Sequence, residues 1–317
     1  MTAEGAGAGH GTVLVTGAAG EVGRRLVGRL ARDGWRVRAL VLPNDPLRTR
    51  LDGTGAEIVE GDIRAPETLV AATAGVQAVA HLAAVILARD PRDYDTVNRR
   101  GTANLVAAAA AAGVRHFVYV SSASVVYPRL TPYGRAKLDA ETIVAAETRL
   151  AHTIVRPTLV YDETGGQEFM LFRKYLRRFP VVPFVGPGSA RKRPVYSDDV
   201  VDGLARIVGN PVCFGKTYNL SGPEAITLRD LAKLVLKLEG ASRPFLHLPL
   251  PICRALAEVL SRVMPDPPLT PYAVAGFTND ADLDCGPAAA DFGYAPRGVR
   301  EGLARSIAPD FKEESSR

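Results

Sequence analysis

The stretch TVLVTGAAGEVG, residues 12–23, decides the fold. A short apolar run ends at Thr16-Gly17, two further glycines follow at three-residue spacing, and a helical pattern then begins. This order predicts a strand, a tight turn and the start of a helix. Small residues at 17–20 would let the phosphates of a ligand approach main-chain N–H groups, and Gly23 would let the helix pack closely on the sheet. The stretch fits a dinucleotide pyrophosphate or a plain strand–turn–helix, and its context must decide between them.

Composition indicates a globular enzyme with an anionic small ligand. The 317 residues are 47% hydrophobic and 23% charged, which suits one large domain or one domain with a smaller partner. The net charge of +5 is modest, and no basic run or aromatic–basic interleaving indicates nucleic acid. Cys213, Cys253 and Cys285 form no metal-type or redox-type pair, and no apolar run is long enough to span a bilayer. We therefore expect a soluble cytoplasmic protein.

Strand-like and helix-like segments alternate from residue 11 to about residue 160. The alternation predicts an α/β fold in which a doubly wound parallel sheet carries helices on both faces. Ligands of such sheets bind beyond the carboxyl ends of the strands. The predicted strands are 13–16, 35–42, 56–60, 77–82, 114–121 and one starting at 153, and the predicted helices are 24–33, 66–74, 94–112 and 132–149. Later helices are expected at about 168–178, 198–208, 228–238 and 252–263.

Two clusters beyond the glycines carry side chains suited to acid–base chemistry. Tyr133 and Lys137 lie four residues apart at the start of a predicted helix, so they share one face. A nearby ammonium would lower the pKa of the phenol towards the working range, although a surface Tyr–Lys pair fits the same spacing. Ser121, Ser122 and Ser124 follow a predicted strand and could hold a substrate oxygen, or could simply turn the chain.

The order of these motifs resembles one enzyme family. Thr16-Gly17-x-x-Gly20-x-x-Gly23, Asp62-Ile63, Leu82-Ala83-Ala84, Asn98, Ser121-Ser122 and Tyr133-x-x-x-Lys137 occur as in the extended short-chain dehydrogenase/reductases. Arg156-Pro157-Thr158, the stretch from Arg193 to Val200, and Tyr218-Asn219-Leu220-Ser221-Gly222 extend the likeness. The chain is similar, from about residue 11 to residue 305, to the NAD-dependent epimerase/dehydratase group.

The resemblance implies a Rossmann-type fold with a smaller C-terminal α/β substrate-binding lid. Residues 1–10 would be a flexible leader and residues 11–160 the dinucleotide-binding domain, to which later strands return. Residues 161–308 would mainly form the substrate-binding domain, followed by a flexible tail over 309–317. A small-molecule substrate is implied, with a sugar nucleotide as one candidate, and a homodimer is compatible with the family.

The resemblance also implies roles for single residues. Tyr133 would be the catalytic acid/base, Lys137 would lower its pKa and bind the nicotinamide ribose, and Ser122, with Ser124 as runner-up, would hold the reacting oxygen. Arg193 and Ser124 would bind substrate, and the histidines have no metal-type spacing. The implied coenzyme-binding residues are Gly17, Ala19, Gly20, Glu21, Val22, Gly23, Arg38, Asp62, Ile63, Leu82, Ala83, Ala84, Asn98, Ser121, Tyr133, Lys137, Pro157 and Thr158.

Departures from the family pattern bear on the reaction. Only residues 128–132 separate Tyr127 from Tyr133, a shorter loop than most sugar-nucleotide enzymes carry, and the acidic pair of the sugar 4,6-dehydratases is missing. We expect a sugar-nucleotide-type epimerase that acts through a keto intermediate. The alternatives are an NADPH-dependent ketone reductase or alcohol dehydrogenase of the dihydroflavonol-reductase or hydroxysteroid type, and, more remotely, a non-catalytic coenzyme-binding subunit.

The second predicted strand bears on the choice between NAD and NADP. Leu42 occupies the position, about twenty residues past the glycines, where an acidic residue would bind the ribose 2′-OH of NAD. Arg24, Arg38 or Arg48 could reach a 2′-phosphate, although Arg38 could equally be a solvated strand residue. The sequence leans towards NADP.

Overall fold

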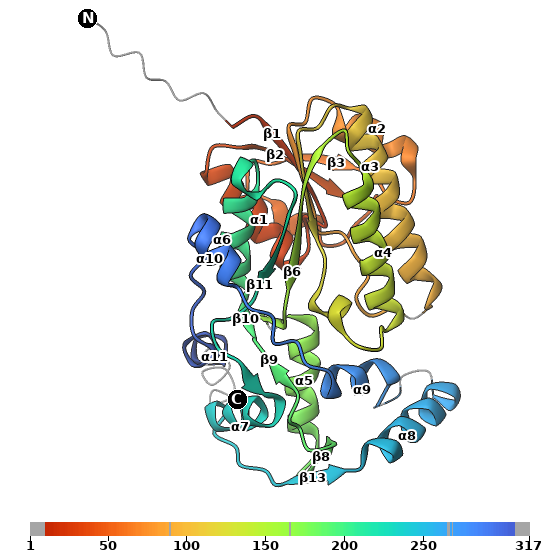
Figure 1. The fold of residues 1–317 in the computed structure, drawn as a ribbon, viewed down its shortest axis with the longest axis vertical. Coiled ribbons are helices and arrows are strands. Elements are labelled where there is room, and N and C mark those ends of the chain that lie inside the picture. The colour runs from red at the N-terminus through yellow and green to blue at the C-terminus, as the bar shows by residue number, and fades with distance from the viewer. Residues whose placement is uncertain (1–9, 89, 165, 265–266, 268, 308–317) are drawn as a thin grey trace, which may run out of the picture.

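The computed structural model describes residues 10–88, 90–164, 166–264, 267 and 269–307. The predicted leader, except for residue 10, and the predicted tail lie outside these residues. Seven strands form one parallel sheet in the order β11-β6-β5-β4-β1-β2-β3 (Figure 1). They are β1 Thr12–Thr16, β2 Arg36–Val41, β3 Glu57–Glu60, β4 Ala78–His81, β5 His116–Val120, β6 Ala151–Pro157 and β11 Lys216–Leu220.

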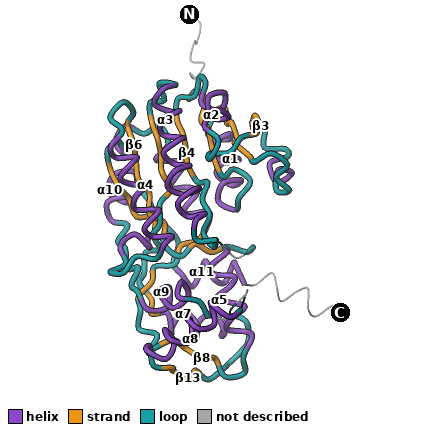
Figure 2. Tube along the Cα trace, turned by 90° about the vertical axis from the view of Figure 1, so that its right-hand side faces the viewer, coloured by secondary structure: helices purple, strands orange, loops and turns teal. Residues whose placement is uncertain are grey.

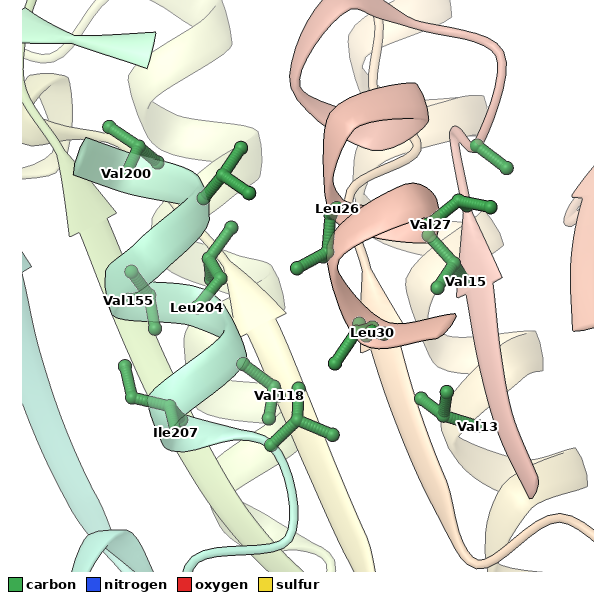
Figure 3. Packing of buried hydrophobic residues seen from close by; sticks show 14 of the residues in the cluster. Val13, Val15, Leu26, Val27, Leu30, Val118, Val155, Val200, Leu204 and Ile207 are labelled. Atoms are coloured by element: carbon green, nitrogen blue, oxygen red, sulfur yellow. The ribbon is translucent and has the colours of Figure 1, made fainter. Parts of the chain in front are cut away.

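Helices cover both faces of the sheet, so the predicted doubly wound fold is confirmed. One face carries α1 (Glu21–Arg32) and α6 (Ser197–Ile207), and the other carries α2 (Pro66–Thr73), α3 (Thr102–Ala111) and α4 (Pro132–Ala146). Because side chains alternate along a strand, Val13 and Val15 pack towards α1 whereas Leu14 packs towards α2 and α3. Figure 3 shows the first of these cores, where Leu26 and Leu30 of α1 meet the sheet beside Leu204 of α6.

The C-terminal part stacks below the carboxyl ends of the strands (Figure 2). Its core joins α5 (Gln167–Arg178), α7 (Leu228–Leu238) and α11 (Val299–Ile307). Three two-stranded sheets pair β7 (Val160–Tyr161) with β10 (Val195–Tyr196), β9 (Arg191–Lys192) with β12 (Ile226–Thr227), and β8 (Val182–Val185) with β13 (Phe245–Leu248). The remaining helices are α8 (Leu250–Val263), α9 (Pro271–Thr278) and α10 (Gly286–Phe292).

The structure differs from the predicted elements at two places. The helix expected over 94–112 has two parts, a π-helical segment Tyr94–Gly101 and then α3. Helices α9, α10 and α11 lie where the sequence predicted no helix. They are short, and α9 and α10 begin within Pro-containing segments whose composition is typical of loops. No helix of the described residues is both long enough and apolar enough to cross a bilayer.

Candidate active site

The glycine turn forms a cradle between β1 and α1. Gly17 has φ +66°, and a Cβ on it would lie 2.8 Å from the backbone nitrogen of Ala83. A Cβ on Gly23 would lie 2.0 Å from the Gly17 carbonyl oxygen, so α1 can approach the turn only with glycine there. Gly20 precedes α1 without a side-chain cap, which leaves N–H groups of the first turn for a ligand. These residues fit a dinucleotide pyrophosphate. Ala19 is buried in the turn, and Val22 is half-buried in the first turn of α1.

A buried hydrogen-bonded chain joins the ends of β1 and β4. Thr102 donates to the Asn98 carbonyl at 2.7 Å, so its oxygen accepts from His81 Nε2 at 2.9 Å. His81 Nδ1 then accepts from Thr16 at 2.7 Å, and the Thr16 oxygen accepts from the Ala83 N–H at 3.2 Å. Burial, helped by the charge of Lys137, lowers the pKa of His81 to about 3, so the ring is neutral. Nothing in the sequence near His81 indicates its two threonine partners, which lie 65 and 21 residues away.

The loop that carries Leu82, Ala83 and Ala84 is held by Asn98. Its side-chain amide accepts from the Val85 N–H and donates to the Val85 carbonyl, both at 2.8 Å. Asn98 is 1% exposed in the π-helical segment, so its side chain positions this loop beside the glycine turn.

Asp62 and Ile63, which the family resemblance assigns to the coenzyme, follow the end of β3. The Asp62 carboxylate accepts from the Arg64 side chain and N–H, and the Arg64 side chain holds the pKa of that carboxyl below its usual value. Ile63 is buried, and its carbonyl accepts from the Asn104 amide at 2.9 Å. The Glu21 carboxylate binds Arg24 and Arg50 and accepts from the Thr164 hydroxyl, so its side chain is engaged within the protein.

The Arg38 side chain binds the end of helix α2. It lies in the middle of β2, paired with Leu14, and its guanidinium donates to the carbonyls of Ala71, Ala72 and Ala74 at 2.9–3.3 Å. These carbonyls end α2, where a cation is favourable. Glu57 accepts a further bond at 3.0 Å. Arg38 therefore caps a helix, and these carbonyls hold its guanidinium away from the carboxyl end of the strand, where the predicted coenzyme contact would lie.

Tyr133 and Lys137 lie together at the start of α4. Thr131 caps this helix by accepting from the Gly134 N–H at 3.1 Å, and a Cβ on Gly134 would lie 2.9 Å from the Ser124 carbonyl oxygen. The first turn of α4 therefore packs directly on the serine loop. Tyr133 is 6% exposed and Lys137 is 2% exposed. The Lys137 ammonium donates to the Val120 carbonyl at 2.6 Å.

The serines differ in their contacts. Ser122 accepts from the Ser124 N–H at 3.1 Å, and its hydroxyl lowers the pKa of the Tyr133 phenol. Ser124 donates to the Ser122 hydroxyl at 3.0 Å. The Ser121 hydroxyl is buried at the end of β5 and has no hydrogen-bond partner among the described residues. An orphaned buried hydroxyl beside the cradle is a further feature that fits a bound coenzyme.

The electrostatics of Tyr133 also differ from expectation. Burial raises the pKa of the phenol above its usual value, the Glu168 carboxylate raises it further, and the Ser122 hydrogen bond opposes them. Burial lowers the pKa of Lys137 to about 7. The structure thus holds a protonated phenol, which is a proton donor.

Aromatic rings from distant segments surround Tyr133. The ring centroids of Tyr94 and Tyr272 lie 5.9 and 6.5 Å from that of Tyr133. Tyr272 donates to Glu168, which lies in the first turn of α5. Tyr94, Glu168 and Tyr272 were missed by the sequence analysis, because they come from three segments that only the tertiary fold brings together.

Arg193, predicted to bind substrate, is engaged by other groups of the protein. Its guanidinium donates to Asp282 at 2.5 Å and to the Pro223 carbonyl at 2.9 Å. Thr158 donates to the Arg193 carbonyl and follows Pro157, the last residue of β6. No cluster of three or more His, Cys, Asp or Glu side chains suited to a metal occurs within the described ranges.

Known proteins share these features. Residues 17–176 match a family described as NAD(P)H-binding. The chain is 32% identical over 242 residues to the ceramide reductase of Caulobacter vibrioides, covering 76% of this chain and 75% of that protein. It is 29% identical over 328 residues to the 2-alkyl-3-oxoalkanoate reductase of Stenotrophomonas maltophilia, covering 92% and 97%. The crystal structure of gox2253 has a TM-score of 0.78 at 27% identity, over 95% of this chain and 98% of that one.

The fold, the cradle and these relatives define an NAD(P)-dependent oxidoreductase. The chain belongs to the extended short-chain dehydrogenase/reductases, the family that includes the NAD-dependent epimerases and dehydratases.

Proposed function

We propose that the protein is an NADPH-dependent reductase of ketones, with Tyr133 as the proton donor. The observation that carries this proposal is the surface around Tyr133. Rings of Tyr94 and Tyr272 and the Glu168 carboxylate lie there, while Arg193 is engaged by Asp282. A sugar nucleotide brings a diphosphate, which calls for cations, and a carboxylate beside aromatic rings suits it poorly. The geometry therefore favours a reductase over the epimerase expected first.

The catalytic residues would divide the work as follows. Ser122 would hold the carbonyl oxygen of the substrate. Tyr133 would donate its proton to that oxygen as the C=O π bond breaks, and the hydroxyl group of the product forms. Lys137 in its protonated form would stabilise the phenolate that remains. When bound, the nicotinamide coenzyme supplies the hydride for the carbonyl carbon. The coenzyme would lie in the glycine cradle, held also by Asp62, Ile63 and the 82–84 loop.

The end of β2 supports NADP as the coenzyme. Leu42 follows this strand, is 48% exposed and brings no carboxylate that would repel a 2′-phosphate. Arg48 follows in the next turn, where it pairs with Glu60 at 2.9 Å across two exposed side chains. Exposed pairs of this kind are weak, so Arg48 is able to exchange its partner for a phosphate.

The test measures coenzyme oxidation by the purified protein with ketones and, separately, the conversion of UDP-glucose. We expect stoichiometric loss of NADPH with a ketone. Tyr133→Phe should lower kcat by about 10²–10⁴ and leave NADPH binding unchanged, because only the proton donor is lost. Tyr175→Phe is a matched control, since Tyr175 lies on α5 and donates to the Pro183 carbonyl. Interconversion of UDP-hexoses without net coenzyme change would refute the reductase and restore the epimerase.

A further inference from the structure

Strand β9 turns its neighbouring side chains to opposite sides. Arg191 and Arg193 both bind Asp282, at 2.8 and 2.5 Å. Lys192 lies between them, so the alternation of a strand sends its side chain the other way. There its ammonium lies 5.5 Å from the centroid of the Tyr127 ring. The cation on the Tyr127 side of this strand is therefore Lys192 and not Arg193.

Lys192 is a buried cation with spare hydrogen-bonding capacity. It is 6% exposed, and its ammonium donates to the Asn279 carbonyl at 2.6 Å. In the part of the chain that the structure describes, no carboxylate forms an ion pair with it. An ammonium has three N–H donors, so two of them lack a partner here. Buried charged donors left unpaired are costly, which makes this position suited to an anionic ligand group.

Two contacts place Lys192 on elements that also carry the surroundings of Tyr133. Its ammonium faces the ring of Tyr127, six residues before Tyr133, and it donates to the carbonyl of Asn279 at the end of α9. Helix α9 also carries Tyr272, whose ring centroid lies 6.5 Å from that of Tyr133. The Glu168 and Asp280 carboxylates favour the charged form of Lys192, while burial lowers its pKa to about 8. At neutral pH the side chain therefore keeps its positive charge.

We propose that Lys192 binds a carboxylate of the substrate, so that the ketone reduced at Tyr133 is an oxo acid. This assignment rests on the proposed ketone reductase. One buried ammonium suits one negative charge. A diphosphate would bring at least two negative charges, and the side chains of both neighbouring arginines point away from this position. Glu168 sharpens the selection, because its own charge would repel a second anionic group.

The experiment compares straight-chain 3-oxo, 4-oxo and 5-oxo acids, each beside its methyl ester, with saturating NADPH. For the wild-type protein we expect kcat/KM for the best acid to exceed that for its ester by about tenfold or more, the range of a charge-assisted hydrogen bond. Lys192→Met should abolish this preference while ester turnover persists, which shows that the variant is folded. Glu168→Gln should lower KM for the acid, because it removes a like charge.

Arg191→Met is the matched control, since it removes the same charge from the neighbouring strand position that faces away. It should keep the preference of the wild type for the acid. Equal turnover of acid and ester by the wild type, or an equal loss of both in Lys192→Met, overturns the proposal. If the protein reduces no ketone at all, the proposed function fails. Binding of the acid and of the ester then tests whether Lys192 holds a carboxylate. In that case the acid, and not the ester, must raise the Tm of the wild type and of Arg191→Met but not that of Lys192→Met; any other pattern overturns the proposal.

Discussion

Replacing Arg38 by methionine separates a structural role from a role in coenzyme choice. Methionine keeps much of the apolar stem and removes the guanidinium, which donates to three carbonyls at the end of α2. The Ala72 bond is the part-buried one, whereas the bonds to Ala71 and Ala74 are exposed and water can replace them. The ion pair with Glu57 is partly exposed and adds little.

The expected loss is therefore about 2 kcal/mol. One charged hydrogen bond contributes about 1.5 kcal/mol and the helix end about 0.5 kcal/mol. At about 2.1 cal/mol/K per residue, the 317 residues give an unfolding entropy of about 0.7 kcal/mol/K, so Tm should fall by about 3 °C.

The assay is thermal unfolding together with the KM values for NADPH and NADH. Both KM values should stay unchanged in Arg38→Met. Arg36→Met is the control, because Arg36 is exposed on the same strand face and the described structure records no hydrogen bond from its side chain. An unchanged Tm, together with a KM for NADPH raised tenfold or more, would refute the structural role of Arg38 and would show that it binds the 2′-phosphate.

Three further changes test the coenzyme site and the buried lysine. Leu42→Asp places a carboxylate at the end of β2, so the ratio of kcat/KM for NADPH to that for NADH should fall by about tenfold or more; a ratio that stays constant contradicts the NADP assignment. Gly23→Ala should abolish coenzyme binding or folding, since its Cβ would meet the Gly17 carbonyl at 2.0 Å, whereas Gly28→Ala, with 3.7 Å of space, should be neutral or stabilising. Lys137 has a pKa of about 7 in the folded protein and about 10.5 in the unfolded chain. Between pH 7 and 10 the unfolded chain therefore carries a proton on Lys137 that the folded protein lacks. The free energy of unfolding should rise over this range by up to about 1.4 kcal/mol per pH unit. Urea unfolding at several pH values checks this, and Lys137→Met should give a flatter profile; an equally steep profile would show that other groups cause the rise.

The sequence by itself determined the order of strands and helices up to about residue 160 and the place of the glycine cradle. These features depend on neighbours within a few residues: apolar alternation, the spacing of Gly17, Gly20 and Gly23, and the four-residue step from Tyr133 to Lys137. The predicted doubly wound sheet is confirmed because a parallel strand buried on both faces needs a continuous apolar run, which is visible in one dimension.

Only the tertiary structure decided which charges are available to a ligand. Arg38 and Arg193 carry the right charge at plausible positions, yet the end of α2 and Asp282 engage them. Nothing in the sequence marked Lys192 as a candidate ligand. The alternation of the strand turns its side chain towards Tyr127 and the end of α9, where the Glu168 carboxylate favours its charged form. The partner of a long charged side chain is set by residues tens of positions away, such as the 89 that separate Arg193 from Asp282, and local pattern does not contain that information.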